Sequence, residues 1–176
     1  MDPQSQFQAE LNRSDREHHQ PTAGAMIGHV TANLLIHSLK VEQAALFATG
    51  PAALFLDRHA GDWLNREDDF RHRLNRALRV EGDLVPTTSQ QLQEFSMMEE
   101  NGAQKYAAGS DQLADLVKDF ALQLVFITKA IKLARAADHP GQEQVLGELV
   151  AWIKEQVWRA QAFRGKQPQE DLLEEE

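Results

Sequence analysis

A histidine and a glutamate interrupt two otherwise apolar helical stripes, where they could form an ion pair or bind a metal. His37 lies in the stripe of residues 26–50, and Glu67 lies in the stripe of the next helical segment. If the chain turns back at Gly50, His37 faces Trp63, one helical turn from Glu67. We favour a buried ion pair or a hydrogen-bonded core histidine. A metal site that uses both side chains is the alternative, disfavoured because the facing stripe of the third long segment is wholly apolar.

Two acid–histidine pairs on the second long segment have a spacing that suits metal binding. His59 stands three residues before Asp62, and Asp69 stands three residues before His72. Residues three apart share one face of a helix, and imidazole with carboxylate can bind iron and other transition metals. The alternative is that both pairs only belong to the solvated face of an amphipathic helix.

Arginines crowd the end of the same segment. They are Arg71, Arg73, Arg76 and Arg79. Positive charge suits the negative end of the helix dipole, and it suits salt bridges between subunits. A phosphate-binding patch is the alternative interpretation.

Four long amphipathic segments must position these residues, and each repeats apolar side chains at steps of four and three. They are residues 22–48, 52–81, 110–138 and 140–163. Short breaks with glycine and proline separate the first from the second and the third from the fourth, so each pair is expected to form an antiparallel hairpin. Residues 83–109 are predicted as a crossover with a short helix at 89–100, because Thr88 and Gln91 have the spacing of a capping box.

No segment has the alternating pattern of a strand, so the expected fold class is all-α. Two helical hairpins with a long crossover predict a ferritin-like four-helix bundle. We expect an N-terminal arm or short helix over residues 1–20, the bundle over 21–165 and an acidic disordered tail over 166–176. Thr22 and Ser110 are the predicted N-caps of the first and third long helices. Trp152 and Trp158 lie off the main stripe of the last helix and are expected to face a neighbouring subunit.

Composition limits the chemistry. The chain has 176 residues, of which 42% are hydrophobic, and it contains no cysteine, so disulfides and thiolate metal sites are excluded. Its net charge of −9 repels nucleic-acid phosphate, so DNA contact requires a local basic patch, whereas acidic surfaces suit hard cations. No apolar run has membrane-spanning length and the N-terminus is polar, so we expect no membrane partner and a cytoplasmic location.

Four stretches between residues 21 and 165 resemble one protein family. They are PTAGAMIGHVTANLLIHSLKVEQA, EGDLVPTT, MEENGAQKY and DHPGQEQVLGEL. The chain resembles the Dps (DNA protection during starvation) mini-ferritins, and in particular the divergent Dps-like proteins of lactic acid bacteria. The resemblance implies a subunit that assembles into a hollow homo-dodecamer, stores oxidised iron, consumes peroxide and in some members binds DNA. No organic cofactor is implied.

The resemblance also implies where an iron-oxidation site between subunits should lie. The family's site needs a His-Trp pair late in the first helix, and here that pair falls on Ala45-Leu46. It also needs an aspartate and a glutamate late in the second helix, and these fall on Arg71 or His72 and on Asn75 or Arg76. Alanine and arginine cannot supply iron ligands. We therefore expect the usual ferroxidase centre to be degenerate, which leaves the catalytic residues unknown and enzymatic activity undecided.

Members of the family often bind DNA through the N-terminal arm. The DNA-binding candidates in this arm are Arg13, Arg16, His18 and His19. The arm contains two arginines, four acidic residues and no lysine, so its charge is 2 − 4 = −2 with neutral histidines. The first function hypothesis is an iron-storage shell that protects DNA against oxidative stress. The second is a nucleoid-associated DNA-binding protein without iron oxidation, and the third is a purely structural helical assembly.

Overall fold

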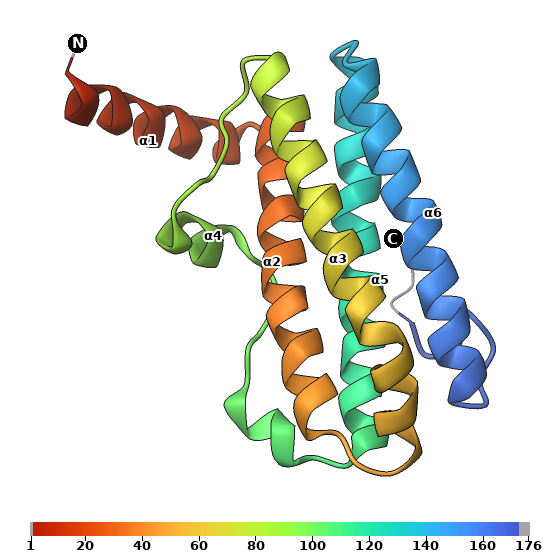
Figure 1. Cartoon of the computed structure of the whole chain (residues 1–176). Coiled ribbons are helices and arrows are strands. Elements are labelled where there is room, and N and C mark those ends of the chain that lie inside the picture. Colours follow the sequence, from red (N-terminus) through yellow and green to blue (C-terminus); the bar gives the residue numbers. More distant parts are fainter. Residues whose placement is uncertain (1, 173–176) are drawn as a thin grey trace.

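The computed structural model describes residues 2–172 and is all-α within them, as the sequence predicts. Its elements are α1 (Pro3–His19), α2 (Ala23–Phe47), α3 (Pro51–Val80), α4 (Ser89–Phe95), the 3₁₀ helix η1 (Gly102–Tyr106), α5 (Gly109–Ala136) and α6 (Pro140–Phe163). The four long helices α2, α3, α5 and α6 form a bundle (Figure 1). Across residues 2–172, no helix is both long and apolar enough to cross a membrane.

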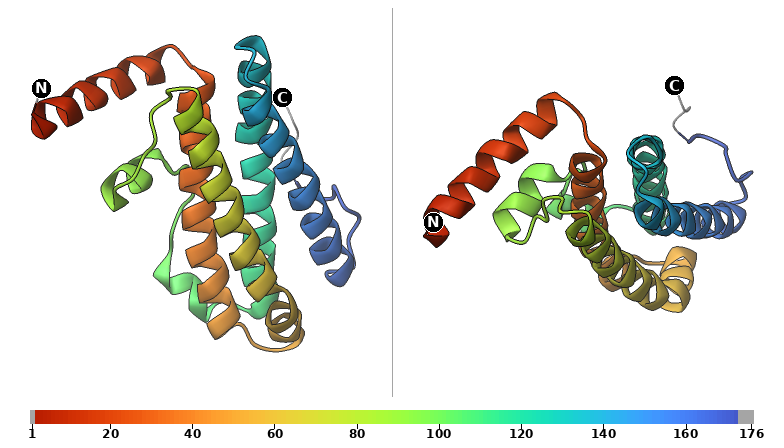
Figure 2. Two further views of the ribbon diagram at one scale, coloured as in Figure 1. Left: turned by 45° about the horizontal axis from the view of Figure 1, so that its top comes forward. Right: turned by 90° about the horizontal axis from the view of Figure 1, so that it is seen from above.

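The bundle consists of two antiparallel hairpins joined by a long crossover. Helix α2 packs against both α3 and α5, while α6 packs against α5 and α3. The crossover segment, residues 81–108, carries α4 and η1 down the outside of α2 and returns the chain to the start of α5 (Figures 1 and 2). One side of α2 therefore faces α5 and the crossover together.

Side-chain caps mark the starts of α1, α2, α4 and η1, whereas α3, α5 and α6 begin without one. Thr22 accepts a hydrogen bond from the Ala25 amide, and Thr88 with Gln91 forms the predicted capping box. The prediction of Ser110 as the N-cap of α5 is wrong, because Ala108 holds that position without a side-chain cap. A Cβ on Gly109 would lie 2.3 Å from the Thr49 carbonyl oxygen. This close approach to the α2–α3 turn, rather than a cap, sets the start of α5.

Large aromatic side chains fill the centre of the bundle. Trp63 and Phe120 are fully buried with their ring centroids 5.0 Å apart, and the Trp63 indole donates to Gln156 over 3.1 Å. The prediction that Trp152 faces another subunit is wrong, since it is 8% exposed and packs on Phe120. Helix α6 contacts two helices, so its buried face is wider than one stripe. Trp158 is 53% exposed.

The N-terminal helix lies outside the bundle. Helix α1 has no buried residue and projects from the top of α2 (Figures 1 and 2). Arg13 anchors it by donating to the Gly82 carbonyl oxygen over 3.1 Å, and Gln91 donates to the Glu10 carboxylate over 3.3 Å. Most of its surface therefore remains open.

The segment predicted as a disordered tail is partly described. Residues 166–172 form turns that fold back on α6, where Gln161 donates to the Glu170 carbonyl oxygen over 2.7 Å. Leu172 packs against the core. Residues 173–176 of the predicted tail lie outside the described residues.

Candidate functional site

His37 and Glu67 meet in the centre of the bundle. Both side chains are fully buried, and His37 Nδ1 hydrogen-bonds to Glu67 Oε1. His37 Nε2 lies 3.2 Å from the Leu116 carbonyl oxygen, and the Phe120 ring packs 4.4 Å from the imidazole. The Leu116 carbonyl only accepts, so Nε2 donates to it, and when Glu67 is ionised Nδ1 donates as well. This geometry describes an imidazolium paired with a carboxylate, which favours the ion-pair interpretation over a metal ligand.

The surrounding charges hold the proton on His37. Burial by itself lowers the pKa of His37, but the carboxylates of Glu67 and Asp119 and the Leu116 carbonyl raise it by more, so the pKa of His37 lies above its ordinary value. Burial also raises the pKa of Glu67, an effect opposed by the charge of His37 and its hydrogen bond. Both ring nitrogens of His37 are occupied by Glu67 and by the Leu116 carbonyl, so neither is free for a metal. Glu67 Oε2 is buried without a hydrogen-bond partner among the described residues.

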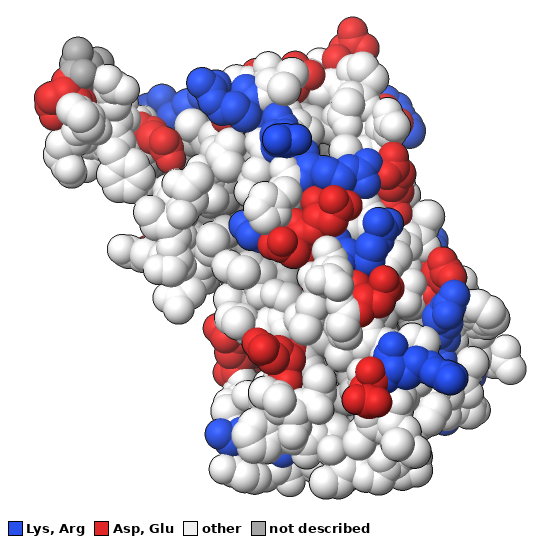
Figure 3. Space-filling view, viewed as in Figure 1, with Lys and Arg blue, Asp and Glu red and all other residues white. Residues whose placement is uncertain are grey.

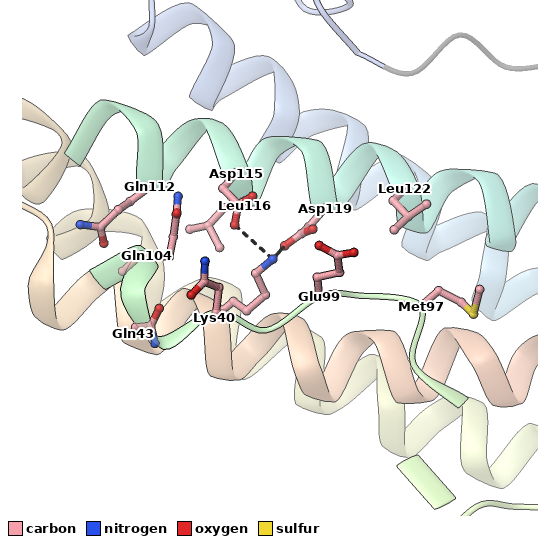
Figure 4. Close-up of a pocket in the computed structure, with 12 residues that line it drawn as sticks. Lys40, Gln43, Met97, Glu99, Gln104, Gln112, Asp115, Leu116, Asp119 and Leu122 are labelled. Atoms are coloured by element: carbon pink, nitrogen blue, oxygen red, sulfur yellow. Dashed lines mark ion pairs between the residues drawn. The ribbon is translucent and has the colours of Figure 1, made fainter. Parts of the chain in front are cut away.

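The expectation of a wholly apolar stripe on α5 is wrong. Asp119 is 8% exposed, and Lys40 of α2 reaches it with its Nζ 2.5 Å from Asp119 Oδ2. Lys40 Nζ also lies 3.1 Å from Asp115 Oδ2 (Figure 4). Burial lowers the pKa of Lys40, but Asp119 and Asp115 raise it by more, so the ammonium is held in its charged form. Lys40 stands three residues after His37 and the two aspartates stand four apart, so helical spacing was the available signal.

A polar pocket of about 370 Å³ opens beside this ion-pair network. It lies between α2, α5 and the crossover segment (Figure 4), and we call it the Lys40 pocket. Its charged lining residues are Lys40, Glu99, Asp115 and Asp119. Burial raises the pKa of Asp119, an effect opposed by the charges of His37 and Lys40.

The two acid–histidine pairs predicted on α3 are not brought together. His72 Nδ1 lies 2.8 Å from the Asp68 carbonyl oxygen, whereas Asp69 faces Arg66 and Arg73. Each member therefore has a different partner from the one its spacing predicts.

The other pair on α3 is also separate. His59 packs on the Phe55 ring at 4.4 Å and makes no hydrogen bond or ion pair with Asp62 within the described part of the chain. Burial, followed by the charges of Arg159 and Arg58, lowers the pKa of His59. Among residues 2–172, no group of three or more His, Cys, Asp or Glu side chains is arranged to hold a metal ion.

Three of the four candidate DNA-binding residues of α1 already have hydrogen-bond or ion-pair partners within the subunit. Arg13 pairs with Glu17, His18 Nδ1 lies 2.6 Å from the Ser14 carbonyl oxygen, and His19 Nδ1 lies 2.7 Å from the Asp15 carbonyl oxygen. His18 also stacks on the Phe95 ring at 4.9 Å. Arg16 is exposed and forms no ion pair with any residue in the described range.

The arginine cluster of α3 divides into paired and unpaired members. Arg71 pairs with Asp68, and Arg73 pairs with Glu148 of α6 over 2.6 Å. Arg76 and Arg79 are exposed and have no ion pair within residues 2–172. Because Arg13 is anchored at Gly82, the C-terminal half of α1 lies beside the end of α3. Lysine and arginine side chains gather on the molecular face where these two helices meet (Figure 3). We call Arg16, Arg76 and Arg79 the arginine patch.

The fold defines this chain as a ferritin-like four-helix-bundle protein. Its structure is similar to that of Lactococcus lactis DpsB, with a TM-score of 0.87 and 28% identity, over 93% of this chain and 95% of that chain. Lactococcus lactis DpsA gives a TM-score of 0.89 and 26% identity, over 96% of this chain and 99% of that chain. The predicted resemblance to the Dps family, with relatives in lactic acid bacteria, is therefore confirmed.

More distant structures share the same fold. Dps from Listeria monocytogenes matches with a TM-score of 0.80 and 21% identity, over 85% of this chain and 97% of that chain. No protein-family model matches the sequence, and the curated proteins include no match.

Proposed function

We propose that this chain is the subunit of a Dps-like homo-oligomeric shell that stores iron in the cytoplasm and protects DNA against oxidative damage. The observation that carries this proposal is the whole-length likeness to Lactococcus lactis DpsA and DpsB, which extends over 99% and 95% of those chains. The matched region of this chain therefore includes the crossover segment as well as the bundle. A dodecamer is the assembly that the family resemblance implies.

Exposed apolar side chains support assembly. They include Leu46, Leu54, Val80, Tyr106 and Trp158, each more than half exposed in the single subunit. Subunit interfaces are enriched in aromatic and other apolar side chains, so residues of this kind are suited to contact with neighbouring subunits. A closed shell would cover many of them and would explain why the isolated subunit leaves them in water.

The expected loss of the usual ferroxidase centre remains part of the proposal. Ala45 stands at the implied histidine position, and Arg71, at an implied carboxylate position, pairs with Asp68. Neither side chain can donate to iron. Iron would then enter the shell as substrate and be oxidised by peroxide in solution or on acidic cavity surfaces.

The first prediction concerns iron uptake by the assembled particle. We expect size-exclusion chromatography with light scattering to give a mass many times that of the 19.8 kDa chain. After iron(II) and peroxide are added, ferric absorbance should coelute with that particle. Oxidation by oxygen alone should be no faster than in buffer, because the usual ligands are missing.

Two outcomes would contradict this proposal. Iron that fails to coelute with a large particle would exclude storage. Oxidation by oxygen faster than in buffer would mean that a replacement centre exists. The variants to make would then address His37, Glu67, His59, Asp62, Asp69 and His72.

DNA binding without iron oxidation is the second candidate function, and the arginine patch favours it. Arg16, Arg76 and Arg79 are exposed arginines without ion pairs at one end of the subunit, despite the net charge of −9. A shell would display this patch many times, so weak phosphate contacts would add through avidity.

The second prediction tests the arginine patch by retardation of linear duplex DNA. The triple variant Arg16→Gln, Arg76→Gln and Arg79→Gln should weaken DNA binding at least about tenfold. The binding constant of this variant should also depend less steeply on salt concentration. A control triple neutralises three other arginines and has the same net charge. Its substitutions are Arg58→Gln, Arg135→Gln and Arg159→Gln. Equal loss in both triples would exclude a specific patch, and binding that persists in both would exclude a role for these arginines.

A further inference from the structure

The acidic side chains that line the Lys40 pocket outnumber its one basic side chain. Lys40 contributes one positive charge, while Asp115, Asp119 and Glu99 contribute three negative charges, so the balance is 1 − 3 = −2. Lys40 is paired with both aspartates, whereas Glu99 forms no ion pair with another described residue. A pocket with this balance attracts cations. Its own lysine also demonstrates that the aspartates accept a primary ammonium group.

Unused hydrogen-bond acceptors line the same pocket. Gln112 is only 2% exposed, and its Nε2 donates to the carbonyl oxygens of Lys105 and Ala107 over 3.3 and 3.0 Å. Those two bonds fix the amide and leave Gln112 Oε1 without a donor among the described residues. The side-chain amides of Gln43 and Gln104, which also line the pocket, make no hydrogen bond with the described part of the chain. A ligand that donates several hydrogen bonds would satisfy them.

The remaining wall is apolar. Ala44, Met97, Leu116 and Leu122 line the pocket beside the charged groups. Its volume of about 370 Å³ falls in the range of small-molecule sites and far exceeds that of a bare ion. A metal ion is also disfavoured, because no three acidic or histidine side chains among residues 2–172 converge on one point. Lys40 already occupies the place where Asp115 and Asp119 approach each other.

We propose that the Lys40 pocket binds a linear aliphatic diamine or polyamine. One ammonium group of the ligand pairs with Glu99, and the other donates to the free glutamine oxygens on the opposite side of Lys40 (Figure 4). The methylene chain between them lies against Leu116. This ligand class combines positive charge, several N–H donors and an apolar stem, which are the three properties that the pocket complements.

Isothermal titration of the full-length assembled protein with putrescine, at about 0.15 M salt, tests this proposal. Glu99→Gln should raise the Kd about tenfold, which corresponds to the loss of one charge-assisted hydrogen bond. Glu100→Gln removes the same charge from the adjacent exposed residue, which is outside the pocket, and should leave the Kd unchanged. The uncharged isostere 1,4-butanediol should not bind.

The outcomes decide between a site and general charge attraction. Equal weakening in Glu99→Gln and Glu100→Gln would overturn the proposal, as would absence of binding to the unmodified protein. Magnesium competing at the same concentration as putrescine would also overturn it. A second measurement uses Lys40→Ala, which leaves Asp119 without its ammonium partner. Putrescine should raise the Tm of Lys40→Ala more than that of the unmodified protein, and an equal shift would contradict the assignment.

Discussion

Glu67→Leu should lower the free energy of unfolding by about 3–5 kcal/mol, because it leaves the buried imidazolium of His37 without its counter-ion. The side chains of both residues are fully buried, so water cannot replace the lost carboxylate. The double variant His37→Leu and Glu67→Leu removes both charges and should recover most of this loss. Urea unfolding at one fixed protein concentration measures the free energies of unfolding of the unmodified protein, the single variant and the double variant. Equal losses in the single and double variants would show that the charge on His37 does not cause the effect.

The pH dependence of stability provides an independent check on this ion pair. The pKa of His37 is raised in the folded protein, so the native state keeps a proton that the unfolded chain releases above about pH 6.5. The stabilisation is complete below that pH and is lost as the pH rises through the raised folded-state pKa. Within this window the free energy of unfolding should fall by up to about 1.4 kcal/mol per pH unit. The double variant should lack this slope, and a slope that persists would assign the effect to another group.

Trp63→Ala should lower the free energy of unfolding by about 3–5 kcal/mol, because it opens a cavity in the centre of the bundle. The indole is fully buried, packs on Phe120 and Phe55, and donates to Gln156. Trp63→Phe keeps an aromatic ring and should cost about 1–3 kcal/mol, chiefly because Gln156 Oε1 loses its donor.

The same urea titrations rank these two variants. Far-ultraviolet circular dichroism should remain helical for both, since the helices themselves are unchanged. If Trp63→Ala and Trp63→Phe lost the same stability, the hydrogen bond to Gln156 rather than ring volume would explain the loss. Stability unchanged in Trp63→Ala would contradict its place in the core.

Local signals in the sequence predicted the helices and several of their ends. The cap at Thr22 and the capping box of Thr88 with Gln91 depend on contacts within four residues, so residue type and spacing were sufficient. The meeting of His37 with Glu67 was also predictable. The connection between α2 and α3 is only a few residues long, and a short turn sets which residues of the two helices face each other.

Only the tertiary structure decided which side of α5 faces α2. Their connection passes through α3 and the crossover segment, so no local rule fixes their relative rotation or height. For that reason the pairing of Lys40 with Asp119 and Asp115 was missed, and with it the Lys40 pocket. The same long separation hid the contact between Arg13 and Gly82 that brings α1 to the end of α3.

The sequence by itself therefore determined the helical segments, the two hairpins and the ion pair across the first hairpin, because periodicity and short turns act locally. Tertiary packing decided the burial of Trp152, the start of α5 at Gly109 and the surroundings of Lys40. These features depend on contacts between residues far apart in the chain. Such contacts form only when several helices share one core, and their geometry is set by the shapes of all the side chains that fill it.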